Sequence, residues 1–381
     1  MMSLLRPLRA RDPEEGHRAA TQLELFFDLV SVIAIATITS RLHHAISEGH
    51  GVDALGMYVF VFFAVWWAWM NFTWFASAFD NDGPAYRLLV MVIMLGELIF
   101  AGGAGRIFDA DNLHWGVAGW CVMRVGMAGL WLRASADKEY RVTALRYAGG
   151  IVIAQICWIA ILFFKPGSTA FLLWGAFVYV IELCVPVFAE RARTTPFHRH
   201  HVIERYGLLT IITLGEIMLS ISLGFGLLYD AHPNWGAAGA AASAFVIVFG
   251  VFWVYFCEEE HLPKRDMLSA FVWGYGHIFL FIAIATLGAG IAAEIDLAAH
   301  HSHVTRSVVA WWVGVPLALF YLSLWFVRDR MMDLSAGRAV SMPAMAVASL
   351  AAAALGLPTW AFALVATIAV VWRAPLAEPA R

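Results

Sequence analysis

The sequence predicts an all-α fold, a polytopic helical bundle that is integral to a membrane and has about twelve transmembrane helices. The first observation is the composition, which is 61% hydrophobic and only 14% charged, whereas a soluble domain carries about 25% charged residues. The second is the presence of 17 tryptophans, whose amphipathic rings suit the headgroup level of a bilayer. The third is a series of apolar runs, most of them near the length of about 20 residues that crosses a bilayer.

Twelve apolar segments follow one another along the chain. We expect them at 25–45, 54–76, 86–105, 114–134, 147–164, 170–189, 204–228, 236–257, 270–292, 306–327, 340–356 and 358–372. The last two are short and Pro358 lies in the turn between them, so they form either two spans or a re-entrant hairpin. With twelve or with ten crossings, both termini lie on the same side.

The positive charges identify that side. The outer connections carry only Arg41, Arg106, Lys165 and Arg306, and the other lysines and arginines, apart from Arg124, fall at the inner edge. This asymmetry predicts an inner (plasma) membrane protein with both termini in the cytoplasm. The polar, arginine-rich residues 1–20 lack the apolar core of a cleaved signal. Their arginines are expected to rest on anionic headgroups: Arg6, Arg9, Arg11 and Arg18.

A weak internal repeat divides the chain. "LELFFDLVSVIAIAT" from residue 23 resembles "IERYGLLTIITLGEI" from residue 203, and two further pairs of segments recur at offsets of about 185 and 187 residues. An even number of spans between the copies predicts two parallel-related six-helix halves, and a chance match between apolar segments is the alternative. The predicted parts are a cytoplasmic arm (1–22), a first membrane half (23–190), a cytoplasmic linker (191–203), a second half (204–372) and a cytoplasmic tail (373–381).

Four ionisable residues lie near the middle of their predicted spans: Glu97, Arg124, Glu182 and Glu216, with His277 somewhat shallower. A charge at this depth is costly, so each is expected to face the bundle interior and to pair. Arg124 is the single deep permanent cation for three carboxylates, which leaves at least one carboxylate to bind a proton or a cation from solution. A fixed, fully paired network that locks helix packing is the alternative.

Two acids stand at the start of the first span. Glu24 and Asp28 are four residues apart and therefore share one helix face. In the first turn they complement the positive end of the helix, as Glu204 does for the seventh span. The expected partner is an inner-leaflet arginine: Arg205, Arg141 or Arg87. The functional alternative is an inner gate at the mouth of a polar pathway.

Other clusters have simpler interpretations. A solvated outer loop accounts for His300, His301 and His303 beside Glu294 and Asp296, since their spacing is not diagnostic of a divalent metal. Headgroup contacts account for His198, His200 and His201. Close helix packing accounts for the glycines of the fourth span: Gly116, Gly119, Gly126 and Gly129. No metal site and no cofactor is predicted.

The sequence contains no zinc-peptidase motif, phosphate loop or serine-hydrolase elbow, and no basic stripe for nucleic acid. An enzyme is therefore less favoured, although an intramembrane enzyme needs no such motif. The expected partners are the lipid bilayer and a small solute or ion.

Three segments resemble the bacterial low temperature requirement A (LtrA) family. "ELFFDLVSVIAIATIT" carries the type of motif that opens the family's first span, "ERYGLLTIITLGEIML" (204–219) is similar to a second hallmark, and "YGHIFLFIAIATLGAG" (275–290) to a third. Ser31 departs from the phenylalanine expected there. The resemblance implies a many-span bacterial inner-membrane protein named for growth at low temperature, with no implied substrate. The signature positions, of unknown role, are Glu24, Phe26, Phe27, Asp28, Glu204, Arg205, Gly207, Gly215 and Glu216.

The leading functional hypothesis is proton-coupled secondary transport of a small solute or ion. Glu216 and Glu97 would carry the proton or cation, and Arg124 would serve as counter-ion or bind a substrate anion. Glu24 and Asp28 would form the inner gate. The alternatives are an intramembrane enzyme or lipid-handling protein, and a structural or sensory membrane protein whose buried charges are fully paired.

Overall fold

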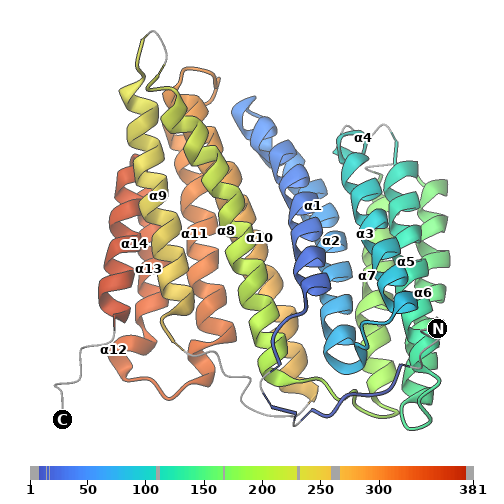
Figure 1. Cartoon of the computed structure of the whole chain (residues 1–381). Coiled ribbons are helices and arrows are strands. Elements are labelled where there is room, and N and C mark those ends of the chain that lie inside the picture. The colour runs from blue at the N-terminus through green and yellow to red at the C-terminus, as the bar shows by residue number, and fades with distance from the viewer. Residues whose placement is uncertain are drawn as a thin grey trace, which may run out of the picture. The chain divides into compact units, whose positions relative to one another are not determined.

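The computed structural model describes residues 8–13, 15–16, 18–108, 112–165, 168–229, 232–258 and 267–374, and in this part of the chain all regular structure is helical. Each predicted apolar segment coincides with a helix (Figure 1). The long helices are α1 (Gln22–Ser47), α2 (Gly51–Phe79), α3 (Pro84–Gly102), α5 (His114–Ala134), α6 (Arg141–Ala160), α7 (Thr169–Glu190), α8 (Arg199–Gly226), α9 (Trp235–Phe256), α10 (Met267–Ala298), α11 (Arg306–Val327), α13 (Ser341–Ala354) and α14 (Thr359–Arg373). The short helices are α4 (Ala104–Phe108) and α12 (Ala336–Ala339).

Ten helical segments of the described residues are long and apolar enough to cross a membrane, with α12 and α13 counted together. Two of the twelve predicted spans do not meet this standard. α5 carries Arg124 and Arg133, and α14 has only 15 residues. The structure therefore supports a polytopic helical membrane protein, while the count of twelve stays a prediction.

The helices form two compact units. Unit 1 contains Met1–Ile38 and Phe60–Leu208, and unit 2 contains Thr39–Val59 and Leu209–Arg381. Neither unit is a continuous stretch of chain, because α1, α2 and α8 each contribute to both. The division into parallel-related halves at 23–190 and 204–372 stays a prediction.

Unit 1 depends on close approach of α3 and α5. A Cβ atom on Gly96 would lie 2.5 Å from the backbone nitrogen of Met123, and one on Gly119 would lie 2.5 Å from that of Phe100. Neither contact leaves room for a side chain, so the two backbones pack directly against each other. The interpretation of the glycines in this span as packing residues agrees with the structure.

The N-terminal arm is part of unit 1 and packs against the C-terminal end of α2. Arg18 is buried and donates hydrogen bonds to the carbonyl oxygens of Ser77 and Ala76, near the C-terminus of α2, where a cation complements the helix dipole. The expectation that Arg18 rests on headgroups is therefore wrong. Burial lowers the pKa of Arg18, and burial together with the charge of Glu24 raises the pKa of Asp80 beside it. Arg11 pairs with Glu15 instead.

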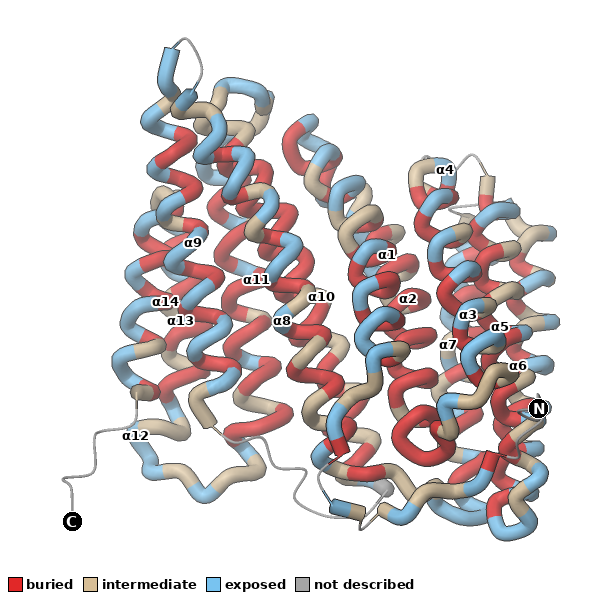
Figure 2. Tube along the Cα trace, viewed as in Figure 1, coloured by how far each residue is buried: buried red, intermediate tan, exposed pale blue. Residues whose placement is uncertain are grey.

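Unit 2 is centred on α10, which is buried along most of its length (Figure 2). α10 packs on α11, α11 packs on α13, and α9 packs on α14. The hairpin of residues 39–59, which joins α1 and α2, completes the unit. Asp296 of α10 accepts hydrogen bonds from His43 at 2.7 Å and from Ser47 at 2.9 Å, and Gly51 leaves space for the ring of Trp312.

The α3–α5 contact yields a first prediction. Gly119→Ala should lower the free energy of unfolding of the detergent-solubilised protein by about 1–3 kcal/mol, because the added methyl group forces two backbones apart. Thermal unfolding followed by tryptophan fluorescence measures the change. Gly149→Ala is the matched control. Gly149 lies on the exposed face of α6, and no atom lies within 4 Å of the position that the added methyl group would take. Equal melting temperatures for the two variants would contradict the packing.

Candidate functional site: a buried polar stripe on α1

The first turn of α1 is closed by a capping box. The backbone N–H of Glu24 donates to the hydroxyl of Thr21 at 3.2 Å, and the Glu24 carboxylate accepts from the N–H of Thr21 at 2.7 Å. Each side chain thereby accepts a hydrogen bond from a backbone N–H that has no partner within the helix. The helix-end interpretation of Glu24 therefore agrees with the structure.

Asp28 forms a bidentate ion pair with Arg205 of α8. Arg205 Nε donates to Oδ2 at 3.0 Å and Nη2 donates to Oδ1 at 2.6 Å, while Trp69 Nε1 donates to Oδ1 at 2.6 Å. All three side chains are fully buried. Of the three arginines expected as partners, the structure selects Arg205; Arg87 pairs with Asp82 at the surface instead.

Glu24 shares the same arginine. Its Oε1 lies 3.3 Å from Arg205 Nη1 and 3.1 Å from His201 Nε2. His201 and His198 are buried, so the expectation that they contact headgroups is wrong. His198 instead binds the carbonyl oxygen of Glu15 in the arm at 3.0 Å. This corner of unit 1 is therefore an ordered ionic cluster rather than a solvated helix end.

The buried face of α1 continues this cluster upward. Glu24, Asp28 and Ser31 recur at intervals of four and three residues, so they lie on one helix face, and none of them is exposed. We call these three residues the α1 polar stripe. At its upper end the Ser31 hydroxyl donates to Glu97 Oε2 at 2.9 Å.

Glu97 is the least compensated of these acids. It is fully buried on α3, and its Oε1 accepts no hydrogen bond. Within the described residues no lysine, arginine or histidine forms an ion pair with it. The expectation of a deep carboxyl group without a cation is therefore met at Glu97.

Glu182 has the opposite environment. Its carboxylate is paired with Arg124 of α5 and accepts from Trp67 Nε1 at 3.0 Å and Trp158 Nε1 at 3.1 Å. The guanidinium of Arg124 also lies 4.5 Å from the ring centre of Trp120. Four helices thus converge on one acid whose charge is fully offset, which is the arrangement expected of a fixed structural network.

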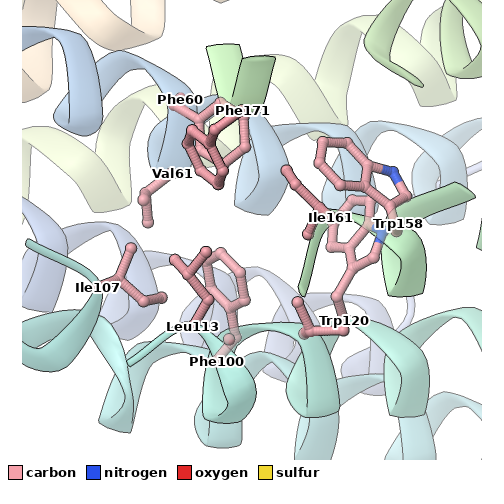
Figure 3. Close-up of a pocket in the computed structure, with 11 residues that line it drawn as sticks. Phe60, Val61, Phe100, Ile107, Leu113, Trp120, Trp158, Ile161 and Phe171 are labelled. Atoms are coloured by element: carbon pink, nitrogen blue, oxygen red, sulfur yellow. The ribbon is translucent and has the colours of Figure 1, made fainter. Parts of the chain in front are cut away.

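An apolar pocket of about 40 Å³ lies next to this network (Figure 3). Trp120 and Trp158 form one side of it, and Phe60, Phe100 and Phe171 form others. The same two indoles contact Arg124 and Glu182. The buried ion pair therefore fixes the walls of a cavity that has aromatic and aliphatic lining.

The remaining candidates lie elsewhere. Glu204 is half-buried near the arm, with Oε1 3.4 Å from the backbone nitrogen of Ala20. Glu216 belongs to unit 2 and is exposed, so the expectation that it faces a bundle interior is wrong. α8 buries Thr213, Leu214 and Ile217 instead, which turns Glu216 to the other face.

His277 also belongs to unit 2. It is buried on α10 and its Nδ1 donates to the carbonyl oxygen of Trp273 at 2.8 Å. Among the described residues, no three His, Cys, Asp or Glu side chains are grouped so as to hold a metal ion.

Sequence reasoning missed the tryptophans whose indole N–H groups donate hydrogen bonds to the buried acids. Trp67, Trp69 and Trp158 stand in the sequence only as parts of apolar runs. The available signal is that Trp67 and Trp69 lie well inside a predicted span, where an indole N–H needs an acceptor. Ser31 stands out in the sequence only as a departure from the expected motif.

These features define a polytopic helical membrane protein in which the buried acids Asp28 and Glu182 are each held by arginine and tryptophan. The family model described as bacterial low temperature requirement A protein (LtrA) matches residues 19–374. The chain therefore belongs to the LtrA family, and the resemblance seen in the three segments is confirmed.

One similar curated protein comes from Rhizobium meliloti (strain 1021) and bears the name "Uncharacterized protein RA0937". It is 25% identical over 323 residues, which cover 80% of this chain and 76% of that protein. No solved structure matches the chain.

The Arg124–Glu182 pair yields a second prediction. Arg124→Met should lower the free energy of unfolding by about 3–5 kcal/mol, because it leaves a buried carboxylate without its cation. The double variant Arg124→Met with Glu182→Leu should lose less, since no charge is then left unpaired. Thermal unfolding in detergent compares them, with Arg141→Met on the exposed surface as the control. A double variant less stable than Arg124→Met would contradict this view.

Proposed function

We propose that the protein is a secondary transporter that couples the movement of a small solute or ion to protons, with Glu97 as the proton-carrying group. The observation that carries the proposal is the environment of Glu97, a buried carboxyl group with one serine donor and, in the part of the chain that the structure describes, no cation paired with it. An ionised carboxylate is costly in such surroundings, whereas a protonated one is tolerated. Glu97 can therefore hold a proton that a change of surroundings would release.

The α1 polar stripe supports a route for that proton. Ser31 connects Glu97 to the same helix face as Asp28 and Glu24, and about 1.5 Å of rise per residue places these groups on successive turns. Arg205 offsets the two lower acids, so the predicted inner gate would have a fixed positive charge at its centre. Exchange of Arg205 between neighbouring carboxylates would be the step that opens it.

The other residues predicted for the proton pathway take different roles in this proposal. The pairing of Glu182 with Arg124 suits a rigid support more than a carrier. Glu216 is retained as a second carrier, because an exposed carboxylate on an apolar helix also needs a cation or a proton. His277 is retained as a relay in unit 2.

A second candidate function is the handling of lipid or another apolar molecule. The pocket in Figure 3 favours it, because its lining is aromatic and aliphatic and such cavities take apolar guests. An intramembrane enzyme and a structural or sensory role with fully paired charges remain the further alternatives.

We also infer an inner-membrane location with both termini in the cytoplasm and two parallel-related halves within twelve spans. Reporter fusions at the N-terminus, the C-terminus and the α13–α14 turn test this placement. Cytoplasmic signals at both termini and an external signal at Gly356 are expected. A cytoplasmic signal at Gly356 would instead make α13 and α14 a re-entrant hairpin.

The proton role yields the central functional prediction. Purified protein in liposomes with a trapped pH dye should show proton movement under an imposed potential, and a solute panel should show which solute increases it. Glu97→Gln should reduce the flux to that of empty liposomes, because the amide keeps the shape and can still accept from Ser31 but cannot exchange a proton. Glu216→Gln is measured beside it, and Glu48→Gln, on an exposed turn, is the control.

The folded state of each variant is checked by its melting temperature and elution volume. Wild-type flux in Glu97→Gln would remove Glu97 from the pathway. Loss of flux in Glu216→Gln alone would transfer the carrier role to that residue.

A further inference from the structure

Unit 2 contains a large pocket of about 850 Å³ at the predicted outer side. Its walls are the start of α9, the end of α10, the start of α11 and the start of α14. α14 has 15 residues and its neighbour α9 has 22, so at about 1.5 Å per residue α14 is shorter by about 10 Å. The short helix begins below the level at which α9 begins (Figure 1), and this difference in length leaves the space.

Opposite charges face this pocket without meeting. Glu294 is only 8% exposed and lies among the lining residues, and Arg306 lines the same pocket from the exposed start of α11. The structure gives no ion pair between these two described side chains. The Thr359 side chain lies within hydrogen-bonding reach of Glu294 and lines the same pocket. A ligand with a cation at one end and an anion at the other would pair with both Glu294 and Arg306.

Two aromatic rings frame the opening. Trp235 is 76% exposed and Trp360 is 60% exposed, and both line the pocket. Indole rings at the ends of membrane helices lie at the level of lipid headgroups, and their faces attract ammonium groups. The position and the chemistry of the rim therefore agree with a headgroup as occupant.

The pocket walls are held by the loops around them. Asn234 Oδ1 accepts from the backbone nitrogen of Ala237 at 2.9 Å, and its Nδ2 donates to the carbonyl oxygen of Ala298 at 3.1 Å, which ties α9 to α10. His300 adopts the left-handed conformation, with φ at 63°, and ends α10. A preformed pocket loses little conformational entropy on binding.

From these observations we propose that this pocket binds a zwitterion of the phosphoethanolamine type, an ammonium group two carbons from a phosphate. The ammonium group contacts Glu294 and the tryptophan faces, and the phosphate contacts Arg306 through charge-assisted hydrogen bonds. The same chemistry occurs in a phosphatidylethanolamine headgroup and in free phosphoethanolamine. The site is separate from Glu97 and does not depend on the proton role.

The test uses the full chain in detergent and measures binding by the shift in melting temperature and by native mass spectrometry. The probes are short-chain phosphatidylethanolamine, short-chain phosphatidylglycerol, which has the phosphate without the ammonium group, and free phosphoethanolamine. Wild-type protein should bind the ethanolamine lipid more tightly than the glycerol lipid. Glu294→Gln and Arg306→Gln should each weaken that binding by about tenfold.

Matched variants separate the pocket from general surface effects. Arg41→Gln removes another exposed outer arginine of unit 2, Glu48→Gln another outer acid, and Trp115→Leu an outer tryptophan 57% exposed. These three should bind as the wild type does, whereas Trp360→Leu should bind more weakly. Arg306 is exposed, so its variant should fold even if Glu294→Gln does not.

Equal binding of the two lipids, or wild-type binding by Arg306→Gln, would overturn the proposal. Free phosphoethanolamine that binds as tightly as the lipid would support the chemistry and assign the pocket to a soluble zwitterion. Proton flux measured on Arg306→Gln should stay at the wild-type level, so failure here and failure of the proton role are distinguishable.

Discussion

A carboxylate buried in an apolar helical bundle must be offset by donors, and the arrangement of unit 1 depends on this constraint. Asp28 can remain inside only because Arg205 and Trp69 both reach it. Those contacts fix the register of α1 against α2 and α8. Glu182 does the same for α2, α5, α6 and α7 through one arginine and two indoles. The helices are thereby held by a few polar contacts at set depths, in addition to apolar packing that alone would allow them to slide.

Indole groups are well suited to this task. An indole N–H satisfies a carboxylate oxygen while the rest of the ring remains apolar, so it adds no second charge to the interior. The pairing of one arginine with tryptophans therefore neutralises an acid with few polar atoms. Among the described residues neither an arginine nor an indole donates to Glu97, and this difference from Asp28 and Glu182 is what supports the proton role proposed for it.

Much of the fold follows from the sequence, and less of the site does. Apolar length and glycine spacing predict the helices and the close α3–α5 contact, because both are local properties. The spacing of Glu24 and Asp28 predicts a shared face. The sequence cannot tell which of three arginines reaches that face, since the choice of Arg205 depends on how α8 packs. Glu216 was expected in an interior because a charge in the middle of a span is costly, but its depth does not show which face of α8 other helices cover. The partners of Trp67 and Trp158 could not be predicted, because a tryptophan inside an apolar span shows that its N–H needs an acceptor but not which acid supplies it.

The hairpin of residues 39–59 belongs to unit 2, although the chain on either side of it belongs to unit 1. Asp296, which binds His43 and Ser47, is synthesised some 250 residues after them. During synthesis the hairpin is therefore made long before Asp296. Until α10 has been synthesised, His43 and Ser47 have no contact with that carboxylate. A chain that ended before α10 would therefore keep the Asp28–Arg205 contacts of unit 1 but would lack the carboxylate that binds His43 and Ser47.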